Sequence, residues 1–189
     1  MKNFKLNEKD ILSNQDWTFP TTTYYGPGRF NEIGKFCEEF DLKNPLIVTD
    51  SGSKDLPFIK KLIALLSKNN IKSDLFYNIS PNPRDDEISK GCDQFKNGSH
   101  DSIIAIGGGS AMDGGKSICL TVNSETPLWD FEFEQPVPKI TKENAFPKII
   151  TVPTTAGTGA ETEITAMVTH LEKGMKSVSY THLTLPTKW

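Results

Sequence analysis

Residues 103–116 read IIAIGGGSAMDGGK, and this stretch decides the fold class of the chain. Its first four residues are apolar, as expected for a strand that is buried on both faces of a parallel sheet. Three glycines follow at once, and glycine lets the backbone turn sharply and approach a ligand closely. A helix is predicted over residues 111–122. The stretch therefore predicts a strand, a glycine turn and a helix in direct succession.

Strands and helices are predicted to alternate on both sides of this stretch. The predicted strands cover residues 17–25, 46–49, 73–77, 102–106, 148–152 and 163–168, and the predicted helices cover 31–40, 57–68, 85–97 and 111–122. Residues 123–147 predict an ordered surface loop held by aromatic side chains. Such alternation with short connections is typical of a doubly wound sheet. We therefore expect an α/β, Rossmann-like fold with a mostly parallel sheet.

Composition and charge exclude several classes of protein. The net charge of −3 gives no basic excess of the kind that nucleic-acid binding requires. The longest apolar runs are far shorter than the roughly 18 residues of a membrane-spanning helix, and residues 1–14 lack the apolar core of a secretory signal. Cys37, Cys92 and Cys119 are widely spaced and predict buried thiols in a reducing compartment. We therefore expect a cytoplasmic protein with no nucleic-acid or membrane partner.

The glycine loop has the chemistry of an anion site. A helix that begins near Ser110 presents unpaired N–H groups and a positive dipole end, which suit a phosphate or pyrophosphate. Lys116 is expected to reach back towards the bound anion. Two known fingerprints fail, because GxGxxG requires glycine in place of Met112 and a P-loop requires glycine in place of Ser110. A turn needed only for close passage from strand to helix is the alternative.

Further features predict a nucleotide at the same edge of the sheet. Asp50 follows the strand at 46–49, where a carboxylate accepts hydrogen bonds from an adenosine ribose and repels a 2′-phosphate. Capping of the following turn is its alternative role. Residues 154–161 form a second loop after a buried strand, and its threonines and glycines supply hydroxyl and amide donors. Asn82, between two prolines, fits either a ligand contact or an Asx turn.

These motifs resemble one family. GGGSAMDGGK, residues 107–116, resembles the GGGSxxDxxK signature of the iron-containing (group III) alcohol dehydrogenases. PTTAGTGAE, residues 153–161, resembles the family's PTTxGTGSE, with Ala160 in place of serine. Three shorter matches precede these two in the family's order: Gly26-Pro27-Gly28, Thr49-Asp50 and Pro81-Asn82-Pro83. The ordered set is far more specific than any one motif.

The resemblance implies an N-terminal Rossmann-like domain that binds NAD. By residue-for-residue match, the cofactor site comprises Asp50, Asn82, Gly107, Gly108, Gly109, Ser110, Asp113, Thr154, Thr155, Thr158 and Lys176. Asp50 is implied to bind the adenosine ribose, which favours NAD over NADP, and Asn82 to lie on the adenosine side. The glycines and Ser110 would cradle the pyrophosphate, and the threonines would contact the phosphates and the nicotinamide side. Lys176 would reach the nicotinamide ribose, and Asp113 would lie beside the substrate without acting as a base.

The resemblance also implies hydride exchange between the cofactor and a small primary alcohol or aldehyde. In the family an aspartate and three histidines of a helical second domain hold the metal, Fe²⁺ or Zn²⁺, which polarises the alcohol oxygen. Here His100, His170 and His182 show no HxxxH or DxxxH spacing, so neither a metal ligand nor a catalytic residue is predicted. We expect this truncated chain to bind nucleotide without turnover. The alternatives are a relative of glycerol dehydrogenase or dehydroquinate synthase, and a binding module with no catalytic role.

The reach of the resemblance sets the predicted domain bounds. Residues 1–16 are predicted to be a flexible lead-in, and residues 17–176 the dinucleotide-binding domain. Residues 177–189 do not resemble the family and are predicted to be a tail foreign to the domain, the product of a misjoined reading frame. A domain face left exposed by the missing half predicts association into a homo-oligomer.

Overall fold

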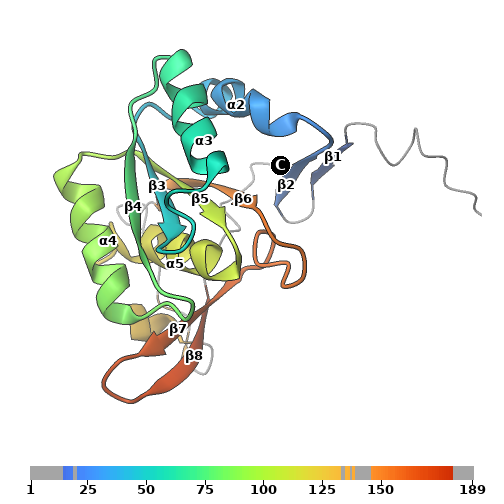
Figure 1. Ribbon diagram of the computed structural model, residues 1–189. Helices are drawn as coiled ribbons and strands as arrows, with labels where there is room; N and C mark the ends of the chain where they lie inside the picture. Colours follow the sequence, from blue (N-terminus) through green and yellow to red (C-terminus); the bar gives the residue numbers. More distant parts are fainter. Residues whose placement is uncertain (1–14, 19–20, 133–134, 137, 139–145, 181–189) are drawn as a thin grey trace, which may run out of the picture.

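The computed structural model of the chain describes residues 15–18, 21–132, 135–136, 138 and 146–180 (Figure 1). The strands are β1 (Gln15–Thr18), β2 (Thr22–Tyr25), β3 (Pro45–Asp50), β4 (Asp74–Ile79), β5 (Ser102–Gly107), β6 (Lys148–Pro153), β7 (Thr165–His170) and β8 (Met175–Tyr180). The helices are α2 (Ile33–Glu39), α3 (Pro57–Lys68), α4 (Asp85–Asn97) and α5 (Gly109–Thr121), with short 3-10 turns η1 (Arg29–Glu32) and η2 (Leu128–Phe131). No helix in these ranges is long and apolar enough to span a membrane.

A four-stranded parallel sheet of order β4-β3-β5-β6 forms the centre of the molecule. The chain steps outward from β3 to β4 through α3 and then returns past β3 to β5 through α4. The strand order therefore reverses between β3 and β5, and in open α/β sheets ligands bind beside the carboxyl ends of the strands at such a reversal. The predicted α/β fold with a mostly parallel sheet is confirmed.

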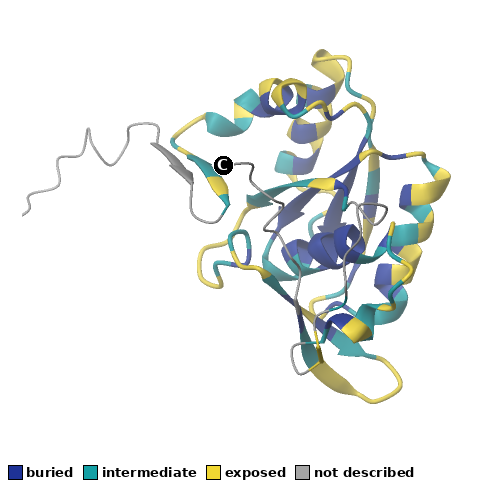
Figure 2. Cartoon of the chain, turned by 180° about the vertical axis from the view of Figure 1, so that it is seen from behind, coloured by how far each residue is buried: buried dark blue, intermediate teal, exposed yellow. Residues whose placement is uncertain are grey.

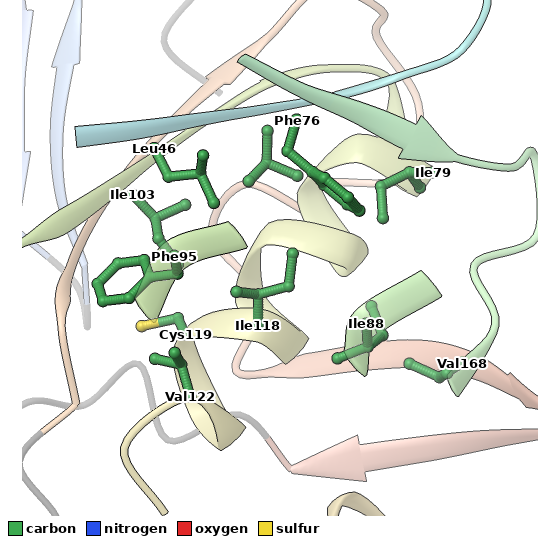
Figure 3. Packing of buried hydrophobic residues seen from close by; sticks show 11 residues of the cluster. Leu46, Phe76, Ile79, Ile88, Phe95, Ile103, Ile118, Cys119, Val122 and Val168 are labelled. Atoms are coloured by element: carbon green, nitrogen blue, oxygen red, sulfur yellow. The ribbon is translucent and has the colours of Figure 1, made fainter. Parts of the chain in front are cut away.

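Helices cover both faces of this sheet because successive residues of a strand point to opposite sides. On one face Ile47, Ile104 and Ile106 pack with residues of α2 and α3. On the other face Leu46 and Ile103 pack with residues of α4 and α5, as Figure 3 shows. Both faces of β3 and β5 are thus removed from water, and Figure 2 shows the buried centre together with the exposed outer sides of the helices.

Two antiparallel hairpins flank the central sheet. A single strand was predicted at 17–25, but the hairpin β1–β2 is found there. The sequence of the predicted strand includes Pro20, and a proline argues against one continuous strand because it has no N–H to donate to a strand ladder. β7 and β8 form the second hairpin. The predicted domain boundary after Lys176 falls inside β8, where the backbone of Ser177 pairs with Val168 and its hydroxyl donates to Glu132. Residues 181–189 of the predicted tail, and 1–14 of the predicted lead-in, lie outside the described residues.

Candidate functional site

The carboxyl ends of β3, β5 and β6 bring the two predicted ligand loops together. Gly107 and Pro153 are register partners at the ends of β5 and β6. The backbone N–H of Thr154 then donates to the carbonyl of Gly107 at 2.9 Å, which ties the threonine loop to the glycine loop. On the opposite side, the hydroxyl of Thr49 in β3 donates to the carbonyl of Ile106 at 2.7 Å. The two loops therefore lie side by side at the strand reversal.

The glycine loop has a backbone conformation and close contacts that leave little room for side chains. Gly107 has a φ of 145°, a conformation that residues with a Cβ rarely adopt. α5 then begins at Gly109, earlier than the predicted start at residue 111, with Gly108 as its N-cap. A Cβ on Gly108 would lie 3.4 Å from the hydroxyl of Thr155, and one on Gly109 would lie 3.2 Å from that of Thr158. The bare backbone and the threonine hydroxyls therefore face each other at the N-terminus of α5.

Asp50 lies at the junction of this loop with β3 and caps the turn that follows. Its Oδ1 accepts the backbone N–H of Gly52 at 3.0 Å, and its Oδ2 accepts the hydroxyl of Ser53 at 2.7 Å. The same Oδ2 would lie 3.1 Å from a Cβ on Gly107. The turn-capping role is therefore present, and it leaves the carboxylate beside the glycine loop.

The loop between β4 and α4 lies against the start of α5. The hydroxyl of Ser110 donates to the carbonyl of Pro81 at 2.6 Å, and Nζ of Lys176 in β8 donates to Oδ1 of Asn82 at 3.1 Å. The buried carboxylate of Glu87 holds this loop in place by accepting the backbone N–H groups of Ser80 and Arg84. Asn82, Ser110 and Lys176, far apart in the sequence, are thus close together.

Lys116 does not extend towards the glycine loop, and this corrects the prediction made for it. Its side chain is buried, with Nζ donating to the carbonyls of Ala160 at 2.9 Å, Glu163 at 3.4 Å and Thr165. Nζ also lies 3.3 Å from Oδ1 of Asp113, one turn earlier in α5. Burial lowers the pKa of Lys116 and raises that of Asp113. Lys116 therefore ties the end of the threonine loop and the segment after it to α5.

The burial of Lys116 had a signal in the sequence. Most of its neighbours along α5 are apolar or glycine: Ala111, Met112, Gly114, Gly115, Ile118, Cys119 and Leu120. A helix that is apolar over most of its surface is largely buried, so a lysine within it needs internal acceptors. Asp113, three residues earlier, lies within reach on the same side of the helix.

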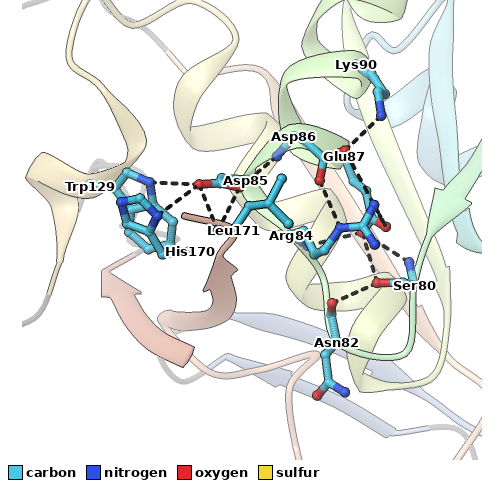
Figure 4. Close-up of polar contacts among 10 residues, drawn as sticks. All are labelled: Ser80, Asn82, Arg84, Asp85, Asp86, Glu87, Lys90, Trp129, His170 and Leu171. Atoms are coloured by element: carbon cyan, nitrogen blue, oxygen red, sulfur yellow. Dashed lines mark hydrogen bonds and ion pairs between the residues drawn. The ribbon is translucent and has the colours of Figure 1, made fainter. Parts of the chain in front are cut away.

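A second polar cluster, which the sequence analysis missed, links α4, η2 and β7 (Figure 4). Asp85, the first residue of α4, accepts the indole N–H of Trp129 at 3.2 Å and the backbone N–H of Leu171 at 3.2 Å. Nδ1 of His170 lies 3.5 Å from the same carboxylate, and its ring stacks on Trp129 with centroids 4.6 Å apart. The cluster fastens the β7–β8 hairpin, and with it Lys176, to α4.

The histidines do not form a metal centre in the described ranges. His100 is buried with Nδ1 2.9 Å from the carbonyl of Asn44, and His170 belongs to the cluster with Asp85. His182 lies outside the described residues. Within the part of the chain that the structure covers, no group of three or more His, Cys, Asp or Glu side chains is arranged to hold a metal ion. These residues therefore do not fit the metal implied by the resemblance.

Comparison with known proteins identifies relatives of this chain. Among curated proteins, the 1,3-propanediol dehydrogenase of Klebsiella pneumoniae is 29% identical over 91% of this chain and 44% of that protein. A solved structure of 1,3-propanediol oxidoreductase has a TM-score of 0.75 and 29% identity, over 82% of this chain and 40% of that one. A sulfoacetaldehyde reductase from Bifidobacterium kashiwanohense, solved in complex with NAD+, has a TM-score of 0.73 and 27% identity, over 83% and 40%. The chain thus spans less than half the length of these relatives.

The family to which the chain belongs is identified by a match along most of the sequence. Residues 20–188 match the family described as iron-containing alcohol dehydrogenase. The match includes both loops at the carboxyl edge of the sheet and confirms the resemblance stated from their motifs. The chain belongs to the iron-containing alcohol dehydrogenase family.

Proposed function

We propose that this chain binds NAD at the carboxyl edge of its sheet, as the nucleotide-binding part of an oxidoreductase that interconverts a primary alcohol and an aldehyde. The contact that carries the proposal is the hydrogen bond from the N–H of Thr154 to the carbonyl of Gly107. It holds a loop of hydroxyl donors against a loop of bare backbone at the N-terminus of a helix. That combination suits the pyrophosphate of a dinucleotide. The relative solved with NAD+ supports the choice of cofactor.

Each part of the site has a role in this proposal. The backbone N–H groups at Gly108, Gly109 and Ser110 bind the pyrophosphate, with Gly107 providing the turn. The hydroxyls of the threonine loop, Thr154, Thr155 and Thr158, line the path from the phosphates to the nicotinamide. The bound cofactor supplies the nicotinamide carbon that accepts hydride from the alcohol. The cofactor fits here because glycine has no side chain. A Cβ at Gly108 or Gly109 would occupy the space in front of the threonines.

The remaining site residues act at the two ends of the cofactor. Asp50 binds the adenosine ribose and makes NAD the preferred cofactor over NADP. Asn82 lies on the adenosine side and Lys176 reaches the nicotinamide ribose. Nζ of Lys176 donates to Oδ1 of Asn82 at 3.1 Å, so the lysine must exchange this hydrogen bond for one to the ribose when the cofactor binds. Asp113 lies beside the substrate without acting as a base, and its ion pair with the buried Lys116 holds it there.

Narrowing the glycine loop should weaken cofactor binding without disturbing the fold. Gly108 has a φ of −81°, which alanine also adopts, and the new methyl group would be 3.4 Å from the hydroxyl of Thr155, an ordinary contact. Gly108→Ala should therefore raise the Kd for NAD about tenfold, the equivalent of roughly 1.4 kcal/mol. Calorimetric titration measures the change. Ser67→Ala, on the exposed side of α3, is the control and should bind NAD like the unmodified chain. Failure of the unmodified chain to bind NAD would remove the proposal.

The chain by itself should bind NAD but not oxidise alcohols. It spans less than half the length of its relatives, and its described residues form no metal site. Turnover requires the reacting carbon to be held against the nicotinamide and the alcohol oxygen to be stabilised. We expect no NADH from simple primary alcohols, with or without added Fe²⁺ or Zn²⁺, in a spectrophotometric assay. Metal-stimulated NADH formation by the purified chain would contradict this expectation.

A further inference from the structure

The carboxylate of Asp50 is held from both sides by the turn that follows β3. The backbone N–H of Gly52 donates to Oδ1 at 3.0 Å, and the hydroxyl of Ser53 donates to Oδ2 at 2.7 Å. One donor on each oxygen fixes the rotation of the carboxylate plane as well as its position. Hydrogen bonds to an ionised acceptor are also stronger than neutral ones. The orientation of Asp50 is therefore set by its neighbours in the turn.

The backbone fixes Ser53 independently of its hydroxyl. Its N–H donates to the carbonyl of Asp50 at 3.1 Å, and its own carbonyl accepts the N–H of Leu56 at 3.0 Å. Removal of the hydroxyl therefore leaves the turn intact and releases one side of the carboxylate. The neighbouring Ser51 contributes its backbone N–H to the carbonyl of Ile79 and is not one of the two donors to the carboxylate.

The turn leaves acceptor capacity on Asp50 for a ligand. An ionised carboxylate has about four lone-pair positions, and the turn uses two of them. The oxygen that Ser53 holds, Oδ2, is also the one that would lie 3.1 Å from a Cβ on Gly107. The free positions are thus held at the glycine loop, where two adjacent hydroxyls of a ribose would each find an acceptor and a 2′-phosphate would meet a fixed negative charge.

We propose that Ser53 is a positioning residue that sets the preference for NAD over NADP by holding the Asp50 carboxylate against the glycine loop. This inference rests on the proposed dinucleotide site. Without the hydroxyl, the carboxylate rotates about its side-chain bonds, which weakens the ribose hydrogen bonds and moves the charge that repels a 2′-phosphate. The affinity for NAD should fall, and the affinity for NADP should fall less or rise.

The test measures the Kd of NAD and of NADP for the full chain and for four variants. Ser53→Ala removes the hydroxyl, Ser53→Thr retains it, Ser51→Ala removes a neighbouring hydroxyl, and Asp50→Asn removes the charge itself. We expect Ser53→Ala to lower the ratio of the NADP Kd to the NAD Kd about three- to tenfold, as for the loss of one hydrogen bond. Ser53→Thr and Ser51→Ala should keep the ratio of the unmodified chain, and Asp50→Asn should lower it at least as far as Ser53→Ala.

The outcomes separate this inference from the proposed site. If the unmodified chain binds neither nucleotide, the dinucleotide site itself is wrong. If the chain binds NAD but Ser53→Ala leaves the ratio unchanged, or weakens both nucleotides equally, Ser53 has no positioning role and the site stands. The positioning role is equally overturned if Ser53→Thr, which keeps the hydroxyl donor, shows the ratio of the alanine variant. A loss of general stability would move both constants together and leave their ratio unaltered.

Discussion

Lys116→Met should lower the free energy of unfolding by about 3–5 kcal/mol, the range expected when one partner of a buried ion pair is removed. Nζ of Lys116 satisfies the carbonyls of Ala160, Glu163 and Thr165 and neutralises Asp113. Methionine fills a similar volume but donates to none of these groups. The variant therefore leaves a half-buried carboxylate and several carbonyls without their donor. Urea unfolding followed by circular dichroism measures the change.

Lys90→Met provides a matched control on the surface of α4. Lys90 also pairs with an aspartate on its own helix, with Nζ 2.8 Å from Oδ2 of Asp86, but its side chain is 60% exposed. An exposed pair of this kind contributes at most about 1 kcal/mol. If Lys116→Met were no more destabilising than Lys90→Met, the buried lysine would have no role in holding the end of the threonine loop and the segment after it.

Strands β3 and β5 could be predicted from the sequence because burial on both faces leaves a plain signal. Leu46, Ile47 and Val48 are all apolar, and they point alternately into the two helical layers. Because all three residues are apolar, the sequence could not show which of them faces which helical layer. The bounds of α3 and α4 were predicted to the residue, since each has a clear amphipathic pattern between turn signals.

The parts of the site that depend on distant partners could not be predicted. The motifs correctly located the loops at the carboxyl edge, because parallel strands end at the same edge of a sheet. The direction of Lys116, however, depends on carbonyls more than forty residues away in the sequence. The cluster of Asp85, Trp129 and His170 likewise joins three separate segments. Local spacing carries no information about such contacts.

Asp50 shows that two interpretations of one residue need not exclude each other. The sequence offered a turn cap and a ribose ligand as alternatives. The structure contains the turn cap, and the capped carboxylate still has free acceptor positions beside the glycine loop. A short polar residue at a strand end can therefore serve the local backbone and a ligand at once.

Gly107→Ala should destabilise the fold by about 2–6 kcal/mol, because two costs combine at the end of β5. The φ of 145° at Gly107 is strained for any residue with a Cβ, at roughly 1–3 kcal/mol. The new methyl group would also lie 2.8 Å from Cβ of Ala111 and 3.1 Å from Oδ2 of Asp50. Ala111 is buried within α5 and has no flexible side chain that could move aside, so crowding adds a cost of about 1–3 kcal/mol.

Gly108→Ala adds the same methyl group one residue later, where neither the strained φ nor the crowding of Gly107 is present. Its φ of −81° suits alanine, and its nearest contact, at 3.4 Å, is the hydroxyl of the exposed Thr155. The loss of stability there should stay below about 1 kcal/mol, as for alanine in place of glycine at an N-cap. Urea unfolding of both variants should therefore separate them clearly, while NAD titration of Gly108→Ala reports on the nucleotide site alone. Equal stability of the two variants would mean that the turn at Gly107 does not require glycine, and that the backbone entering α5 is not fixed as described.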